Sequence, residues 1–244
     1  MIPLRDTIRS QNYPVVNNLL IGVNVIVFLI QLSQGPNLDR FVFTYGLVPA
    51  KFTHPALAAY FGLAGNLFSL LSFMFLHGGF LHLLGNMWSL YIFGDNVEDR
   101  LGPLRYLGFY LAAGMISGLF HMALNMNSQV PTIGASGAIA GVMGAYFILY
   151  PASKILTLIP IIFIPWFIEI PAFVFLGIWF VLQFLSAAGS HAGATGIAWW
   201  AHVGGFIGGI VLLKLFTLVP KAGLSRKIQS TTAKKTSHRL QVLH

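Results

Sequence analysis

The sequence predicts an all-α polytopic membrane protein with six membrane-spanning helices. The first observation is composition: 56% of the 244 residues are hydrophobic and only 8% are charged, whereas an ordinary soluble domain is roughly 25% charged. The second is length, because several apolar stretches reach the roughly 20 residues that a helix needs to cross a bilayer. The third is the placement of the basic residues, which gather on one side of these stretches.

Six apolar stretches are long enough to be membrane spans. They cover residues 15–32, 68–93, 104–124, 133–150, 170–187 and 196–219. Residues 155–168 are also apolar, but Pro160 and Pro165 would interrupt a helix there. We therefore expect this segment to be interfacial or re-entrant and to lead into the fifth span, with Glu169 at the headgroup level.

The basic residues indicate how the spans are oriented. An even number of spans puts both termini on the same side, and of the 14 Lys and Arg residues only Arg40 and Lys51 fall on the opposite side. Because cytoplasmic loops carry the excess of Lys and Arg, both termini are predicted to be cytoplasmic. Much of the net charge of +8 lies in the C-terminal tail, which favours contact with anionic lipid headgroups over nucleic acid.

This topology divides the chain into three parts. Residues 1–14 form a cytoplasmic N-terminal segment, residues 15–219 form the six-span core, and residues 220–244 form a basic cytoplasmic tail that we expect to be disordered. The first loop, residues 33–67, is external, and its mixed polar and apolar character predicts a structured element on the membrane surface. The absence of cysteine excludes disulfides and thiolate metal sites.

Ser136 and His202 are polar residues in otherwise apolar spans, where polar groups are costly and usually functional. Alone, such a serine commonly bonds back to a carbonyl of its own helix, and such a histidine is commonly structural. Here both have small neighbours, including Gly134, Gly137 and Gly205, that let two helices approach closely. A hydroxyl and an imidazole within hydrogen-bond reach form a nucleophile and its base.

The predicted topology brings further polar groups to the same depth. The second, fourth and sixth spans all run from outside to inside, so His82, Ser136 and His202 lie in the outer half of the bilayer. His82 and Asn86 are four residues apart and share a helical face, from which they could donate to an oxyanion beside the Ser136 N–H. Hydrogen bonding between helices is an equally good interpretation of this pair, and it is the main role that we expect for His77.

No acidic residue lies near Ser136 or His202 in sequence or at matching depth, so the prediction is a Ser-His dyad. Aspartyl chemistry would need two aspartates within spans, and Asp39, Asp95 and Asp99 are predicted in loops. A zinc protease is disfavoured because the chain has no His-Glu-x-x-His motif, and a transporter because it lacks mid-membrane acids. No metal or other cofactor is expected.

Three motifs in this order resemble the rhomboid intramembrane serine proteases: His77 with His82 and Asn86, the sequence Gly-Ala-Ser-Gly at 134–137, and Ala-His-Val-Gly-Gly at 201–205. The resemblance implies a six-transmembrane-helix bundle with a water-accessible cavity open to the outside. It also implies Ser136 as nucleophile, His202 as general base and acid, and an oxyanion site formed by His82, Asn86 and the Ser136 N–H. The implied partners are the lipid bilayer and transmembrane segments of other membrane proteins, cut near the outer face.

The chain departs from the family pattern at two places. Ala140 stands where many members have an aromatic residue stacked on the catalytic imidazole, so Trp199 or Trp200 is expected to help orient His202. Phe68 and Ser69 stand where many members have Trp-Arg in the external loop. The alternative function is a catalytically silent relative that binds transmembrane helices without cutting them. The lack of a transit-like segment and the compact core favour a bacterial plasma membrane.

Overall fold

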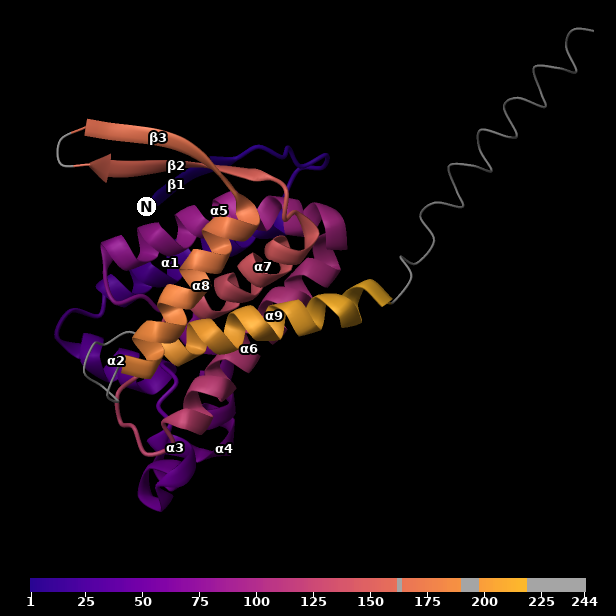
Figure 1. The fold of residues 1–244 in the computed structure, drawn as a ribbon. Helices are drawn as coiled ribbons and strands as arrows, with labels where there is room; N and C mark the ends of the chain where they lie inside the picture. The colour runs from indigo at the N-terminus through magenta and orange to yellow at the C-terminus, as the bar shows by residue number, and fades with distance from the viewer. Residues whose placement is uncertain (162–163, 190–197, 219–244) are drawn as a thin grey trace, which may run out of the picture.

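The computed structural model describes residues 1–161, 164–189 and 198–218. The chain forms a helical bundle with a small antiparallel sheet at one end and helices α2 to α4 at the other (Figure 1). The helices are α1 Val15–Leu32, α2 Leu38–Tyr45, α3 Ala50–Thr53, α4 Pro55–Ser72, α5 Phe80–Leu101, α6 Pro103–Leu124, α7 Ser136–Leu149, α8 Ala172–Gly189 and α9 Trp199–Leu218, with 3-10 turns η1 Gly35–Asn37 and η2 Phe73–Phe75. The strands are β1 Ile2–Asp6, β2 Lys154–Ile161 and β3 Ile164–Pro171.

The polytopic helical bundle predicted from the sequence is confirmed. Among the described residues, five helices are long and apolar enough to cross a membrane: α1, α4 with η2, α6, α8 and α9. Helix α7 is also apolar, but it is shorter than these five helices: its 14 residues extend only about 21 Å along the helix axis. The predicted tail, residues 220–244, lies outside the described residues.

Helix α7 lies at the centre of the bundle and is buried from Gly137 to Tyr146. It packs against α5, α6, α8 and α9. Its contact with α9 is backbone to backbone, since a Cβ built on Gly209 would lie 2.5 Å from the Cα of Gly141. The stripes of small residues predicted from the sequence thus allow these two helices to touch, and they bring the N-terminal ends of α7 and α9 together.

The second predicted span, residues 68–93, is wrong at both ends. Residues 68–72 belong to α4, and α5 begins only at Phe80, after an irregular segment in which Gly79 has φ of +155°. At the other end α5 continues to Leu101, so Asp95 and Asp99 lie in its last turns and not in a loop. The helix extends this far because the Glu98 carboxylate is buried and accepts hydrogen bonds from the N–H groups of Val16 and Asn17, at 3.0 and 2.7 Å.

The predicted external loop, residues 33–67, contains secondary structure, but its last part belongs to α4, one of the five helices long enough to cross a membrane. It contains η1, α2, α3 and most of α4, which is kinked at Gly62 with φ of +66°. Lys51 is fully buried in this segment, where its ammonium group donates to the carbonyls of Phe43 and Thr44 at the end of α2. Burial lowers the pKa of Lys51 to about 8. These bonds satisfy carbonyls that have no partner within α2 and hold α3 against it.

The sequence did not predict the three-stranded sheet. The proline-containing segment 155–168, expected to be interfacial or re-entrant, forms the hairpin of β2 and β3, in which Pro160 lies opposite Pro165. Strand β1, from the predicted N-terminal segment, pairs antiparallel with β2. Alternation explains the hairpin, because Ile155 and Thr157 are buried on one face while their neighbours are more exposed. The sheet therefore adds to the helical bundle without replacing any part of it.

A cluster of hydrogen-bonded polar side chains connects the N-terminal strand β1 to the helical bundle. Tyr146 of α7 donates a 2.5 Å hydrogen bond to the Asp6 carboxylate, and Asn96 of α5 donates to the same oxygen at 2.9 Å. The Tyr146 hydroxyl is also 3.0 Å from the Ser153 hydroxyl, just before β2. Burial raises the pKa of Asp6 from 3.8 to about 6, despite the hydrogen bond from Tyr146. One carboxylate thus connects β1, α5 and α7.

Candidate active site

Ser136 is the first residue of α7, and the chain enters this helix through a constrained turn. Gly134 has φ of +125°, a conformation that favours glycine, and its N–H donates to the Phe73 carbonyl at 2.9 Å. A Cβ on Gly134 would also lie 2.9 Å from the His82 ring. The N–H groups of the first helical turn have no acceptor within the helix, and the positive end of the helix dipole lies there. Ser136 therefore lies where negative charge is stabilised.

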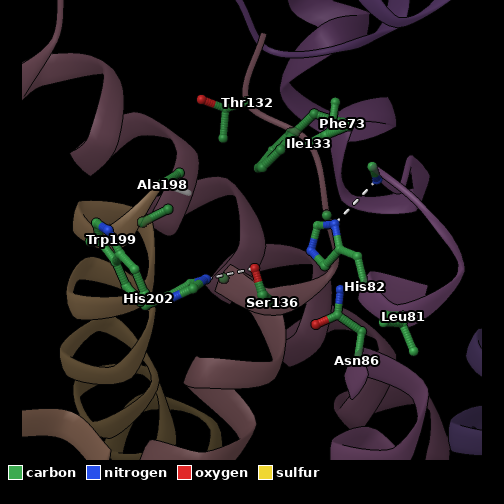
Figure 2. Close-up of a pocket in the computed structure, with 14 residues that line it drawn as sticks. Phe73, Leu81, His82, Asn86, Thr132, Ile133, Ser136, Ala198, Trp199 and His202 are labelled. Carbon is green, nitrogen blue, oxygen red and sulfur yellow. Dashed lines mark hydrogen bonds between the residues drawn. The ribbon is translucent and has the colours of Figure 1, made fainter. Parts of the chain in front are cut away.

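The structure brings Ser136 and His202 together, although they are 66 residues apart in the chain. His202 lies in the first turn of α9, and its Nε2 is 2.8 Å from the Ser136 Oγ (Figure 2). This distance is within the range in which an imidazole accepts a proton from a hydroxyl. The close α7–α9 packing explains the short distance, since both residues lie at the ends that the glycine contacts bring together.

His82 and Asn86 lie on α5, on the opposite side of Ser136 from His202 (Figure 2). The Gly78 N–H donates to His82 Nδ1 at 3.2 Å, so a neutral His82 ring carries its proton on Nε2. The same ring lies against Gly134, two residues before Ser136. The buried Asn86 Nδ2 has no hydrogen-bond partner within the described part of the chain. Two side chains thus face the site, and each carries an N–H group that can donate a hydrogen bond.

All four predicted site residues line one cavity of about 550 Å³. Its wall combines α5, α7 and α9 with the segment before α7, and it is partly open. The lining residues include Ser136, His202, His82, Asn86, Phe73, Leu81, Thr132, Ile133, Ala198 and Trp199 (Figure 2). The cavity joins the candidate nucleophile, base and donors in a single space large enough for several residues of an extended peptide.

His77 departs from its predicted place and role. It precedes α5 and is fully buried, and both of its ring nitrogens lack a hydrogen-bond partner among the described residues. Its ring instead packs edge-on against His82, with centroids 5.2 Å apart. The bonds between helices come from its backbone, because the Gln31 side chain of α1 donates to the His77 carbonyl at 2.6 Å and accepts from its N–H at 3.0 Å.

Sequence reasoning missed two neighbours of His202, both on α8. The Oε1 atom of Gln183 lies 2.7 Å from His202 Nδ1. The Trp179 ring lies 6.1 Å from the imidazole, and the expected contact with Trp199 is also present, at 5.9 Å. The signal for Gln183 was available in the sequence, since an amide is conspicuous in the apolar span 170–187. Trp200, by contrast, packs on Phe120 and Phe184.

In the ranges 1–161, 164–189 and 198–218, no group of three or more His, Asp or Glu side chains is arranged to hold a metal ion. The polar groups nearest the Ser136–His202 contact are the Ser136 hydroxyl, two imidazoles and, if Gln183 is counted, two amides. Together they can transfer protons, supply a nucleophile and donate hydrogen bonds, which is the chemistry of acyl transfer.

Comparison with known proteins agrees with this chemistry. The family model described as the Rhomboid domain matches residues 64–218, more than half of the chain. The chain is 28% identical over 201 residues to "Rhomboid protein 1, mitochondrial" of Saccharomyces cerevisiae, an alignment that covers 79% of this chain and 50% of that protein.

Other relatives match over shorter regions. The chain is 37% identical over 81 residues to "RHOMBOID-like protein 5" of Arabidopsis thaliana (33% of this chain and 26% of that protein). It is 33% identical over 140 residues to "Rhomboid protease GluP" of Bacillus subtilis (57% and 25%). The chain thus spans half or less of the length of these relatives. The match to the family model, which includes all four site residues, shows that the chain belongs to the rhomboid family.

Proposed function

We propose that this protein is an intramembrane serine endopeptidase that cleaves transmembrane segments of other membrane proteins near the outer membrane face. The observation that carries the proposal is the 2.8 Å contact between Ser136 Oγ and His202 Nε2 in a cavity at the start of α7. The presence of proteins named rhomboid proteases among the relatives supports it.

The proposed reaction begins when His202 Nε2 accepts the proton of the Ser136 hydroxyl while Oγ attacks the scissile carbonyl carbon. The tetrahedral intermediate collapses as the protonated His202 gives its proton to the departing amine, which leaves an acyl-enzyme on Ser136. Water then attacks the ester, with His202 again accepting a proton and returning it to Ser136. The products are a new carboxylate and a new amine, and both side chains recover their starting state.

The oxyanion of the tetrahedral intermediate needs donors that are already in place. We assign this role to the Ser136 N–H, His82 Nε2 and the Asn86 amide. The support is that His82 and Asn86 lie across the cavity from His202 and that the Asn86 nitrogen lacks a partner in the resting site. Because Ser136 Oγ lies between His202 and these donors, the carbonyl oxygen of a bound substrate can point toward the donors. The negative charge that develops on this oxygen then lies away from His202.

The proposed substrate class follows from the location of the cavity beside membrane-length helices. An unwound segment of a single transmembrane helix offers an extended backbone to a serine that lies below the membrane surface. We propose a bacterial plasma membrane, and the asymmetry of the basic residues supports placing both termini in the cytoplasm. The relatives include a mitochondrial protein of Saccharomyces cerevisiae and a Bacillus subtilis protease, so localisation by microscopy or fractionation is a separate test.

The test is cleavage by purified protein in liposomes containing a substrate with an unstable transmembrane helix. We expect the wild type to cut it, whereas Ser136→Ala and His202→Ala abolish cleavage and keep the wild-type melting temperature. A fluorophosphonate or isocoumarin probe should label the wild type and not Ser136→Ala. Full cleavage by Ser136→Ala would refute the assignment. Binding of the substrate without cleavage by the wild type would identify a catalytically silent relative.

A further inference from the structure

The imidazole of His202 makes two hydrogen bonds, one at each ring nitrogen. Its Nε2 meets Ser136 Oγ at 2.8 Å, and its Nδ1 meets the Oε1 of Gln183 at 2.7 Å. The three side chains come from three different helices, α7, α9 and α8. The Ser-His pair predicted from the sequence is therefore extended by a third, neutral member.

The Gln183 oxygen determines which nitrogen of a neutral His202 can act as the base. An amide oxygen can only accept a hydrogen bond, so a ring that bonds to it carries its proton on Nδ1. The lone pair then lies on Nε2, the nitrogen that faces Ser136, which is the form that can accept the hydroxyl proton. When the ring becomes doubly protonated during the reaction, the same oxygen still accepts from Nδ1–H and stabilises the cation.

Helix α8 also holds the ring by packing. Trp179 lies four residues before Gln183 and thus on the same helical face, and its ring is 6.1 Å from the imidazole, tilted by 33°. Trp199 packs edge-on against the imidazole, at 5.9 Å. No aromatic ring packs on the imidazole from position 140 of α7, because that residue is the fully buried Ala140. The orientation of His202 therefore depends on α8.

We propose that Gln183 is a positioning residue, which fixes the tautomer and orientation of His202 through an uncharged hydrogen bond. This inference depends on the proposed function, in that it assigns Gln183 to the protease reaction. It does not require Gln183 to touch the substrate. An amide does here what a carboxylate does in a Ser-His-Asp triad, without placing a charge inside the membrane.

The kinetic test replaces the amide by a side chain of similar length that cannot accept this bond. We expect Gln183→Met to lower kcat about 10–100-fold, the loss seen when metal-bound histidines lose an outer partner, with KM changed less than twofold. Gln183→Glu retains an oxygen acceptor and should recover most of kcat. Leu182→Met is the matched control, since Leu182 is exposed on the same helix and should leave both constants unchanged.

The spectroscopic test needs no substrate and measures the tautomer directly. In protein labelled with ¹⁵N-histidine, the signals that disappear in His202→Asn should show Nδ1 protonated and Nε2 unprotonated in the wild type. Gln183→Met should shift these signals toward a mixture of tautomers, and Leu182→Met should not. An Nε2-protonated ring in the wild type, or wild-type kcat in Gln183→Met, would overturn the inference.

The two proposals fail in distinguishable ways. If the wild type does not cleave, or if Ser136→Ala still cleaves, the protease function is wrong whatever Gln183 does. If the wild type cleaves and Ser136→Ala does not, but Gln183→Met has normal kcat and an unchanged spectrum, only the role of Gln183 is wrong. If Gln183→Met fails to fold, the wild-type spectrum still decides the tautomer.

Discussion

At the residue scale, the most informative atom opposite Ser136 is a nitrogen without a partner. Asn86 Nδ2 is buried and makes no hydrogen bond among the described residues. Leaving a buried donor unpaired costs about 1–3 kcal/mol. That cost is acceptable where the missing acceptor arrives with the substrate, as it does for an oxyanion formed during the reaction. The unpaired nitrogen thus supports the proposed role of Asn86 as an oxyanion donor over a role in joining helices.

We predict that Asn86→Ala lowers kcat by about 10²–10³-fold at most, because it removes one of several proposed oxyanion donors. The melting temperature should stay equal to or slightly above that of the wild type, since the unpaired amide is lost. Ser89→Ala is the control on the same helix, because the Ser89 hydroxyl bonds back to the Gly85 carbonyl of its own helix at 2.8 Å. A large loss of stability in Asn86→Ala without a loss of kcat would assign Asn86 to the packing between helices.

Residue type and the order of the spans were sufficient to select four residues that line one cavity: Ser136, His202, His82 and Asn86. Their roles in a reaction remain proposals. Gln183 could not be assigned in the same way. Its partner is decided by how α8 lies against α9, and no periodicity in either helix encodes that distance. His77 was misplaced for a related reason, since the break before α5 depends on the backbone of Gly79.

At the element scale, the position of His202 depends on glycines far along the same helix. Gly205 and Gly209 of α9 face Gly137 and Gly141 of α7 with no side chain between the two backbones. The hydrogen bond between Ser136 and His202 forms at one end of this contact. Any side chain inserted along it separates the helices and lengthens the distance between the two reacting groups.

We predict that Gly209→Ala lowers the melting temperature and slows the labelling of Ser136 by a fluorophosphonate probe. The added Cβ would lie 2.5 Å from the Cα of Gly141, and overpacking of this kind typically costs about 1–3 kcal/mol. Gly22→Ala in α1 is the control, since its Cβ would meet no atom within 4 Å. Wild-type labelling in Gly209→Ala would show that the α7–α9 contact does not control the site.

The ends of the helices were harder to predict than their existence. Helix α5 was expected to end near residue 93 because its last turns are charged, yet Glu98 is buried and bonds to the N–H groups that begin α1. A carboxylate satisfied by another helix has the same sequence signature as one in a loop. Tertiary pairing therefore decides where this helix ends.

At the scale of the whole molecule, the sheet links the N-terminal segment to the segment between α7 and α8. Asp6 is the chemical link, because it bonds to both Tyr146 of α7 and Asn96 of α5. The sheet escaped prediction because β1 has only five residues and its partner lies far along the chain. Hydropathy reports which segments are apolar, but it does not report which distant segments pair.

The raised pKa of Asp6 predicts a pH-dependent stability. Its pKa is about 6 in the folded protein against 3.8 ordinarily, so the folded state binds the proton more tightly. The stability contributed by this proton is complete below pH 3.8 and is lost as the pH rises through about 6. In thermal melts, the difference in melting temperature between wild type and Asp6→Asn should therefore change over this pH range and be constant above it. A difference that is constant at every pH would contradict the prediction.

The pairing of β1 with β2 also bears on how the protein is made. Asp6 leaves the ribosome 149 residues before its strand partner Ile155. At about 5–20 residues per second, β1 waits about 7–30 s for that partner. During this interval the helices α1 to α7 are already emerging, so the first strand of the chain is among the last elements to reach its final place.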